Sequence, residues 1–370
     1  MDWVLGNTIL LTLKGSRAYG LDTQTSDTDV GGVVIPPQNI RNDLFHKFYQ
    51  AENEKSIESA LSHLKNPNNP KLESTIFSLE KFMQLAAAVN PNVIELLFVD
   101  DFLVLSKIGR VLVEHRDLFL SSRAYFTFFG YAYSQAAKIE RHRKWLQKDI
   151  SEPLRKDYGL TDVKNKNIDE IDRAIQSQIN FWDFSTLPLD ELAKNDLKEK
   201  IWDLIKSFKE TDVGFDNWHH KYYFIALNKL SKELNLNEDI VSLIKREKQY
   251  KIDSEQWKSF LNWKKNRNPE RAIVDSKHGY DTKHGCHLLR LSRMGLEILS
   301  TGKLLVKRPD AKELLSVKNG EWSYEKLMDE FISLERVAKK AYESTKLPRS
   351  VNYTQINELY HNLINLYETV

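Results

Sequence analysis

Short apolar runs dominate the first 120 residues of the chain. They are rich in β-branched residues and end at Gly, Pro, Asn or Asp, a pattern typical of strands. The runs are Thr8 to Lys14, Asp29 to Ile35, Ser74 to Leu79 and Val93 to Val99. Glu80 to Val89 has helical periodicity instead and ends at Asn90-Pro91. We therefore predict an α/β (α+β) fold, in which a mixed sheet is flanked by helices.

From residue 121 onward the apolar positions recur with the period of an α-helix. The predicted helices lie near 122–148, 166–181, 190–209, 217–234, 254–266, 281–301, 323–345 and 353–367. The pattern predicts two domains: a mixed α/β domain over 1–120 and a large all-α domain over 121–370.

Composition narrows the class of protein. Of 370 residues, 41% are hydrophobic and 29% are charged, the balance of an ordinary globular protein. Cys286 is the single cysteine, so the chain has no intramolecular disulfide and no Cys-based zinc cluster. The longest apolar stretch, Val93 to Leu105, contains three acids and is too short for a membrane span. Met1 to Leu13 lacks the features of a signal peptide, so we expect a cytoplasmic protein that does not contact a membrane.

The positive charge is clustered, although the net charge is only +2. Basic residues gather in Lys138 to Lys148, Lys258 to Arg267 and Arg271 to Arg308. Such runs favour local anion sites, and the alternative is a solvated helix face.

The candidate chemistry begins where the first apolar strand runs into Gly15-Ser16-Arg17-Ala18-Tyr19-Gly20. This is not a P-loop, because Leu21-Asp22 stands where Lys-Ser/Thr is required. Further on, Asp27 and Asp29 stand two residues apart at the start of a strand, so both side chains point to the same side. Two close carboxylates favour a divalent cation such as Mg2+, and the pair suits a two-metal phosphoryl-transfer site. The alternative is a polar turn before a strand.

The segment Gly15 to Val30 resembles the signature of the DNA polymerase beta-type nucleotidyltransferase superfamily, which is Gly-Ser followed at a fixed distance by Asp-x-Asp. It is most similar to the RNA-repair-pathway DNA polymerase beta family. Further matches to that family are Ser78-Leu79 with Lys81-Phe82, Asn90 to Leu97, Gly130-Tyr131-Ala132, Arg267-Asn268-Pro269, Gly279 to His284 and Gly320-Glu321-Trp322. The resemblance therefore extends over most of the chain.

The resemblance implies that residues 1–120 form a polymerase-beta-like nucleotidyltransferase domain and that the helical domain over 121–370 closes the nucleotide cleft. It also implies roles for individual residues. Gly15 and Ser16 would hold a nucleoside triphosphate, with Arg17 beside them, and Asp27 and Asp29 would bind metal. The family also needs a third carboxylate on a neighbouring strand. Glu73 is our first choice, since it opens a predicted strand, and Glu95 inside the run Val93 to Val99 is the second. Glu95 could instead form a structural ion pair with a core arginine or histidine.

A basic helix near 281–301 is the other candidate part of the site. Lys283, His287 and Arg290 stand at i, i+4 and i+7 on one helix face, and His284 is next to Lys283. We predict that these four residues bind the triphosphate. His284-x-x-His287 could instead bind zinc, but the sequence offers no third ligand nearby. A helix that only pairs with acids of other helices is the remaining alternative.

The predicted function is metal-dependent transfer of a nucleoside monophosphate from a nucleoside triphosphate to an acceptor hydroxyl. It would use two Mg2+ or Mn2+ ions. The expected acceptor is an RNA 3′ end, as in RNA repair. The rivals are nucleotidylation of a protein or a small molecule, and a non-catalytic nucleic-acid-binding module. The sequence leaves open the base, the number of nucleotides added, the acceptor and the oligomeric state.

Overall fold

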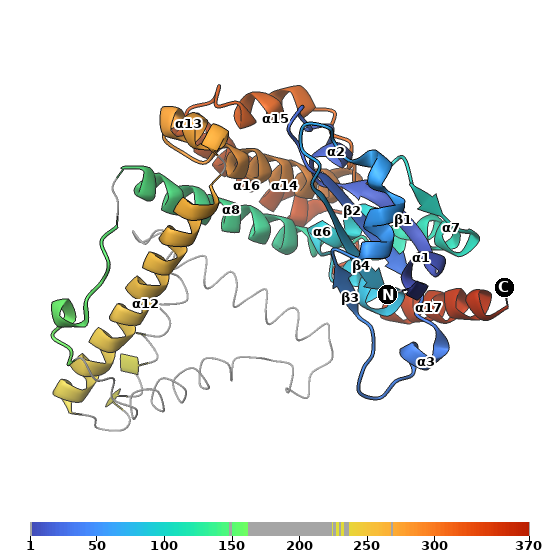
Figure 1. Ribbon diagram of the computed structural model, residues 1–370, viewed down its shortest axis with the longest axis horizontal. Coiled ribbons are helices and arrows are strands. Elements are labelled where there is room, and N and C mark those ends of the chain that lie inside the picture. The colour runs from blue at the N-terminus through green and yellow to red at the C-terminus, as the bar shows by residue number, and fades with distance from the viewer. Residues whose placement is uncertain are drawn as a thin grey trace. The chain divides into compact units, whose positions relative to one another are not determined.

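The computed structural model in Figure 1 describes residues 2–147, 150–161, 237–267 and 269–369, with residues 224, 227, 228, 231 and 232. The helices predicted near 166–181 and 190–209, and most of 217–234, lie outside the described residues. The chain divides into two compact units. The first is Met1–Gln135 together with Thr282–Val370, and the second is Ala136–Asp281.

A five-stranded mixed sheet forms the centre of the first unit, with the strand order β3-β4-β2-β1-β5. The strands are β1 (Thr8–Lys14), β2 (Thr28–Val34), β3 (Gln50–Glu52), β4 (Leu72–Ser78) and β5 (Val104–Leu105). β2 pairs with β4 in parallel, whereas the β1–β2, β1–β5 and β3–β4 pairs are antiparallel. The parallel pair places the beginnings of β2 and β4 side by side.

Two glycines of β2 allow side chains of other elements to approach the strand closely at the centre of the sheet. A Cβ built on Gly31 would lie 2.6 Å from Leu96, and one on Gly32 would lie 2.7 Å from Leu11. Apolar side chains of other elements therefore pack directly onto the backbone of β2. This close approach brings the chain around Leu96 against the strand that carries Asp29.

The strand predicted over Val93–Val99 is wrong. That run forms a short α-helix, α6 (Pro91–Ile94), and a 3-10 helix, η2 (Glu95–Leu97). The side chain of Asn90 accepts a hydrogen bond from the amide of Asn92, and Pro91 occupies the first turn, as is common at helix starts. A short apolar run has the same composition in a buried helix and in a buried strand, so periodicity alone did not separate the two.

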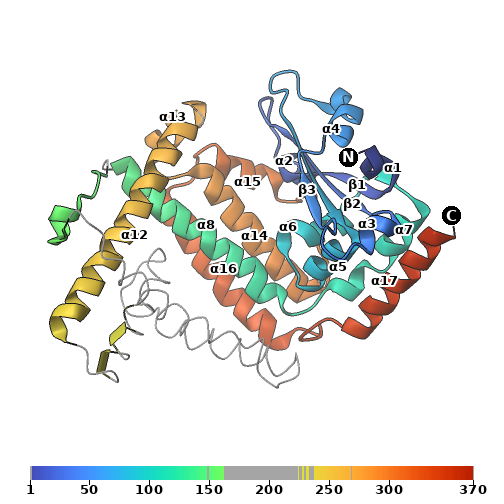
Figure 2. The same cartoon turned by 60° about the horizontal axis from the view of Figure 1, so that its bottom comes forward.

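Helices surround the sheet and complete the first unit, as Figure 2 shows from a second side. Those before residue 120 are α1 (Asp2–Gly6), α2 (Gly15–Tyr19), α3 (Gln38–Arg41), α4 (Lys55–Ala60), α5 (Leu79–Ala87), α6 and α7 (Lys107–Glu114), with the 3-10 helices η1 (Ser62–Leu64), η2 and η3 (Arg116–Phe119). The C-terminal part adds α14 (Thr282–Thr301), α15 (Ala311–Lys318), α16 (Tyr324–Ser344) and α17 (Tyr353–Glu368). α14 packs against α15 and α16, while α17 packs against α5 and α7.

The second unit consists of helices in its described residues. It contains the end of α8 (Ala124–Gln147), the 3-10 helix η4 (Arg155–Tyr158), α12 (Glu238–Asn266) and α13 (Pro269–His278). Trp145 of α8 packs against Phe260 and Trp263 of α12, with ring centroids 5.7 and 5.4 Å away. Arg155 makes two hydrogen bonds, of 3.0 and 2.5 Å, to the carboxylate of Glu247. Aromatic packing and a paired buried charge thus hold α12 in this unit.

The predicted fold class is confirmed: a mixed sheet with flanking helices comes first, and the described residues after 121 form helices. α8, α12, α14, α16 and α17 confirm five of the predicted helices, although α12 begins earlier than expected, at Glu238. The division into domains at residue 120 stays a prediction. Among the described residues, no helix has the length and apolar character needed to cross a membrane.

Candidate metal and nucleotide site

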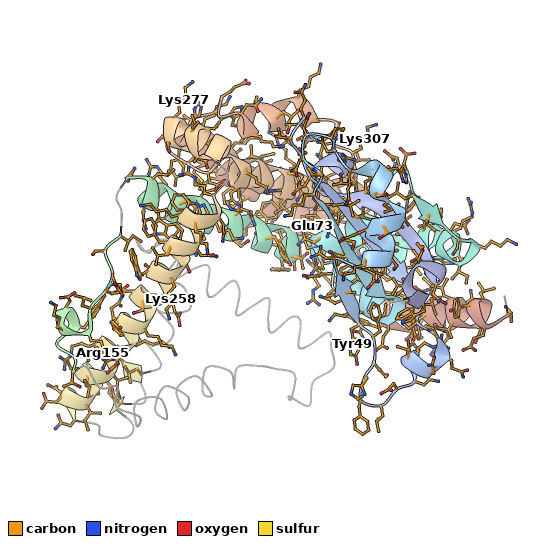
Figure 3. All side chains as sticks on the ribbon, in the orientation of Figure 1. Tyr49, Glu73, Arg155, Lys258, Lys277 and Lys307 are labelled. Atoms are coloured by element: carbon orange, nitrogen blue, oxygen red, sulfur yellow. The ribbon has the colours of Figure 1, made fainter. Side chains whose placement is uncertain are left out.

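Three carboxylates meet where β2 and β4 begin. Asp27 lies in the loop before β2, Asp29 is within β2, and Glu73 is in β4, where it pairs with Asp29 in the parallel register. One carboxylate oxygen from each lies within 4.8 Å of the others. Figure 3 labels Glu73 at this part of the sheet. Glu73, our first choice for the third acid, is therefore beside both aspartates.

Gly15 and Asp29 are in very close contact at the same place. Lys14, the last residue of β1, pairs with Asp29 in the antiparallel register, and Gly15 follows it with a φ of +65°. A Cβ on Gly15 would lie only 2.2 Å from Asp29 Oδ2. Two independent features therefore favour glycine at position 15: the left-handed backbone conformation and the close approach of the Asp29 carboxylate.

The electrostatics of the cluster indicate a place for a cation. Burial raises the pKa of Asp29 above its usual value, and the negative charges of Asp27 and Glu73 add to that effect. The positive charges of Lys14 and Lys283 act in the opposite direction and lower the same pKa. Three oxygen donors with mutual repulsion suit a hard divalent ion such as Mg2+ or Mn2+, so the residues present fit the metal that the family implies.

Two lysines next to the carboxylates were missed by the sequence analysis. Lys71 Nζ lies 2.5 Å from Glu73 Oε1, and Lys14 Nζ donates a hydrogen bond of 3.1 Å to Thr75 Oγ1. Lys71 stands two residues before Glu73, the spacing that places side chains on one side of a strand. Lys14 is the one charged residue in the run from Thr8 to Gly15. The spacing of Lys71 from Glu73 and the isolated charge of Lys14 are the sequence features that could have predicted both lysines beside the carboxylates.

The residues after Gly15 form the short helix α2. Ser16 is its second residue, and its carbonyl accepts a hydrogen bond of 2.8 Å from the amide of Leu21. Arg17 points elsewhere: its Nη1 donates to the carbonyl oxygen of Leu64 at 3.0 Å. Gly15 thus lies beside Asp29 with Ser16 next to it in the chain, while Arg17 ties α2 to η1.

Glu95, the second choice for the third acid, lies in a separate buried cluster. Its carboxylate accepts a hydrogen bond from the hydroxyl of Tyr19 and lies 3.7 Å from Nη1 of Arg290. Burial raises the pKa of Glu95, and the charge of Arg290 and the Tyr19 hydrogen bond oppose that shift. The ion pair with a core arginine, considered from the sequence as the structural alternative, is present.

The remaining candidates lie on α14. Lys283 is exposed, and its charge acts on the pKa of Asp29, so it lies within electrostatic range of the carboxylates. Burial lowers the pKa of His287 well below its usual value, helped by the charges of Arg290 and Lys283, so this imidazole is neutral at pH 7. His284 Nδ1 lies 2.7 Å from Oε1 of Gln135. Contacts of these four residues with a nucleotide stay a prediction.

A mixed sheet with Gly-Ser after one strand, and with three acids where two other strands begin, is consistent with the nucleotidyltransferase palm predicted from the sequence. Residues 6–177 match the model of the RNA repair pathway DNA polymerase beta family. This match supports the family predicted from the sequence, and it covers Gly15, Ser16, all three clustered acids and Glu95. It supports a nucleotidyltransferase, with Asp27, Asp29 and Glu73 as a candidate metal site.

A phage protein resembles the chain over nearly its full length. It is the "uncharacterized 38.9 kDa protein in nrdC-mobD intergenic region" of Enterobacteria phage T4, 23% identical over 366 residues. The similarity covers 92% of this chain and 91% of the phage protein. No solved structure matches the chain.

Proposed function

We propose that the protein transfers a nucleoside monophosphate from a nucleoside triphosphate to the hydroxyl of an RNA 3′ end, in a metal-dependent reaction. The observation that carries the proposal is the meeting of Asp27, Asp29 and Glu73 within 4.8 Å, beside Gly15, which Ser16 follows in the chain. The family match to polymerase-beta-like proteins supports the same chemistry.

Each part of the site has a task in this reaction. Asp27, Asp29 and Glu73 would hold two Mg2+ or Mn2+ ions, which would stabilise the attacking and leaving oxygens when bound. Gly15 and Ser16 would contact the triphosphate next to those acids, and Lys283 would add positive charge to its phosphates. The acceptor oxygen would attack the α-phosphorus in line, and pyrophosphate would leave.

Two observations support RNA as the acceptor. The matching family is described as one of an RNA repair pathway. In the second unit, the end of α12 carries exposed Lys258 and Lys265, and Figure 3 labels Lys258 there. Exposed basic residues of this kind suit contacts with the phosphate backbone of a polyanion such as RNA.

The test offers three acceptors to the purified protein with Mg2+ and each nucleoside triphosphate labelled at its α-phosphate. They are RNA with a free 3′-hydroxyl, the same RNA with a 3′-phosphate, and a mixture of proteins. We expect label only in the first RNA. Label in the protein fraction would refute the RNA acceptor and keep the transferase, whereas no label in any fraction, with Mg2+ or Mn2+, would refute both.

A further inference from the structure

Tyr19, the last residue of α2, is held by a buried carboxylate. The tyrosine is 4% exposed and Glu95 is 3% exposed. The Tyr19 hydroxyl lies 2.8 and 2.7 Å from the two carboxylate oxygens, so it donates a hydrogen bond to Glu95 at close range. This bond, inside the buried cluster, fixes the direction of the tyrosine ring.

Arg290 of α14 holds the same ring from another side. Its guanidinium carbon lies 3.8 Å from the Tyr19 ring centroid, in the geometry of a cation–π contact. Nη1 of Arg290 is 3.7 Å from Glu95 Oε2, and the residue is 4% exposed. Helix α14 thus presents one buried positive charge to both Glu95 and the ring of Tyr19.

This cluster is a costly way to gain stability. Burying a carboxylate and a guanidinium removes both from water, and apolar residues of the same size often give equal or greater stability. Arg290 Nε is also buried without a hydrogen-bond partner among the described residues. We therefore look for a role of the Tyr19–Glu95–Arg290 cluster other than stability. Its contacts fix the orientation of the Tyr19 side chain.

The backbone after Tyr19 is tied to the same C-terminal region. The carbonyl of Tyr19 accepts from the amide of Arg308 at 3.1 Å, and the carbonyl of Leu21 accepts from Nζ of Lys318 at 2.7 Å. Between them, Ala311 lies within 4.0 Å of the place where a Cβ on Gly20 would be. Figures 1 and 2 both show α15 beside α2. Residues 19–21 are therefore fixed by α14, α15 and the connection between them.

We propose that Tyr19, Glu95 and Arg290 are positioning residues, which hold α2 so that Gly15 and Ser16 keep their place beside Asp29. This inference rests on the proposed function and deepens it. β1 holds the start of α2, and the cluster holds its end, so the short helix cannot tilt. In this assignment Arg290 acts through Tyr19, whereas the phosphate contact predicted from the sequence would need its guanidinium to face the nucleotide.

The first measurement is hydrogen exchange of the backbone amides of residues 15–21 in the folded protein. Tyr19→Phe removes only the hydroxyl, and Glu95→Gln removes the charge and replaces one acceptor oxygen with an NH2 donor. Tyr133→Phe is the matched control, because it takes the same hydroxyl from a contact with Glu335 between α8 and α16 in the same unit. We expect exchange at 15–21 to rise about tenfold in the first two variants and to stay at the parent rate in the control. An unchanged rate in both would overturn the inference, whatever the activity.

The second measurement is nucleotidyl transfer with saturating nucleotide and acceptor. A displaced α2 should lower kcat about tenfold in Tyr19→Phe and Glu95→Gln, while Mg2+ raises the melting temperature as in the parent protein. Faster exchange with an unchanged kcat would overturn the positioning role. If the parent protein shows no transfer but exchange still rises in both variants, the proposed function fails and the anchoring of α2 stands.

Discussion

The carboxylate of Asp29 fills the space that a side chain at Gly15 would need, with Oδ2 only 2.2 Å from the position of a Cβ there. Gly15 directly follows Lys14, the last residue of β1, and Lys14 pairs with Asp29 of β2 in the sheet. The position of the Asp29 carboxylate therefore depends on the backbone at Gly15. A substitution at either residue should displace the other.

Gly15→Ala should disturb both the fold and the metal site. An alanine at a φ of +65° is strained, and its methyl group would displace Asp29, so we expect a loss of about 1–3 kcal/mol in the free energy of unfolding. Mg2+ should also stabilise this variant less than the parent. Gly130→Ala in α8 is the control, because among the described residues an added Cβ there would meet nothing within 4 Å beyond its chain neighbours and its own helix backbone. Equal stability of Gly15→Ala and the parent in chemical denaturation would contradict this geometry.

Glu73→Gln should separate chemistry from stability. Its side chain is 44% exposed and its ion pair with Lys71 is at the surface, so the melting temperature should change little. Loss of a metal ligand should lower kcat at least about a hundredfold. Glu95→Gln, in the buried cluster, should cost less activity. If transfer by Glu73→Gln is normal and transfer by Glu95→Gln is abolished, Glu95 is the third ligand.

Cys286 gives a prediction about pH. Burial raises the pKa of its thiol to about 11, above the value of about 8.5 for an exposed cysteine. Between these two values the unfolded chain loses the proton that the folded chain keeps, so the free energy of unfolding should fall as pH rises from about 8.5 to 11. Denaturation of the parent and Cys286→Ala at several pH values measures this contribution. Parallel pH profiles for the two proteins would contradict it.

Lys258 and Lys265 should bind the RNA acceptor through charge. Reversing either charge should weaken RNA binding, with a smaller dependence on salt concentration, while nucleotide binding remains as in the parent. Lys346→Glu, an exposed lysine of the first unit, is the control. Binding curves at several salt concentrations test this. RNA affinity equal to the parent at low salt in both variants would remove α12 from the acceptor site.

The local hydrophobic pattern was sufficient to predict an element where residues at its ends mark its boundaries. Thr8 to Lys14 was predicted with the bounds that β1 has, since a β-branched run ends at glycine. The same reasoning failed at Val93–Val99, where burial on all sides removes the periodicity that separates a helix from a strand. α15 was not predicted, because its eight residues are too few to establish a helical period. Burial by distant parts of the chain is the information that the local sequence lacks.

In the candidate site, too, the residues that share a local motif could be predicted from the sequence, and those brought together by distant packing could not. Asp27, Asp29 and Gly15 stand in one short motif, and Glu73 was chosen because it opens a strand, which proved to be the parallel neighbour of β2. Tyr19 had no such signal, because its partners Glu95 and Arg290 are 76 and 271 residues away along the chain. The i, i+4, i+7 spacing predicts that Lys283, His287 and Arg290 lie on one face of α14. It does not predict which of them is buried. Only the packing of α14 shows that Lys283 is exposed and Arg290 is buried.

The most direct test of nucleotidyl transfer at this site follows both ends of the triphosphate. The parent protein, Asp27→Asn and Asp29→Asn are each given Mg2+, RNA with a free 3′-hydroxyl, and nucleoside triphosphates labelled at either the α- or the γ-phosphate. We expect the parent to place the α-label in the RNA and to release the γ-label in pyrophosphate in equal amounts, and each variant to be at least about a hundredfold slower. Release of the γ-label as orthophosphate, or transfer at the parent rate in both variants, would contradict the account.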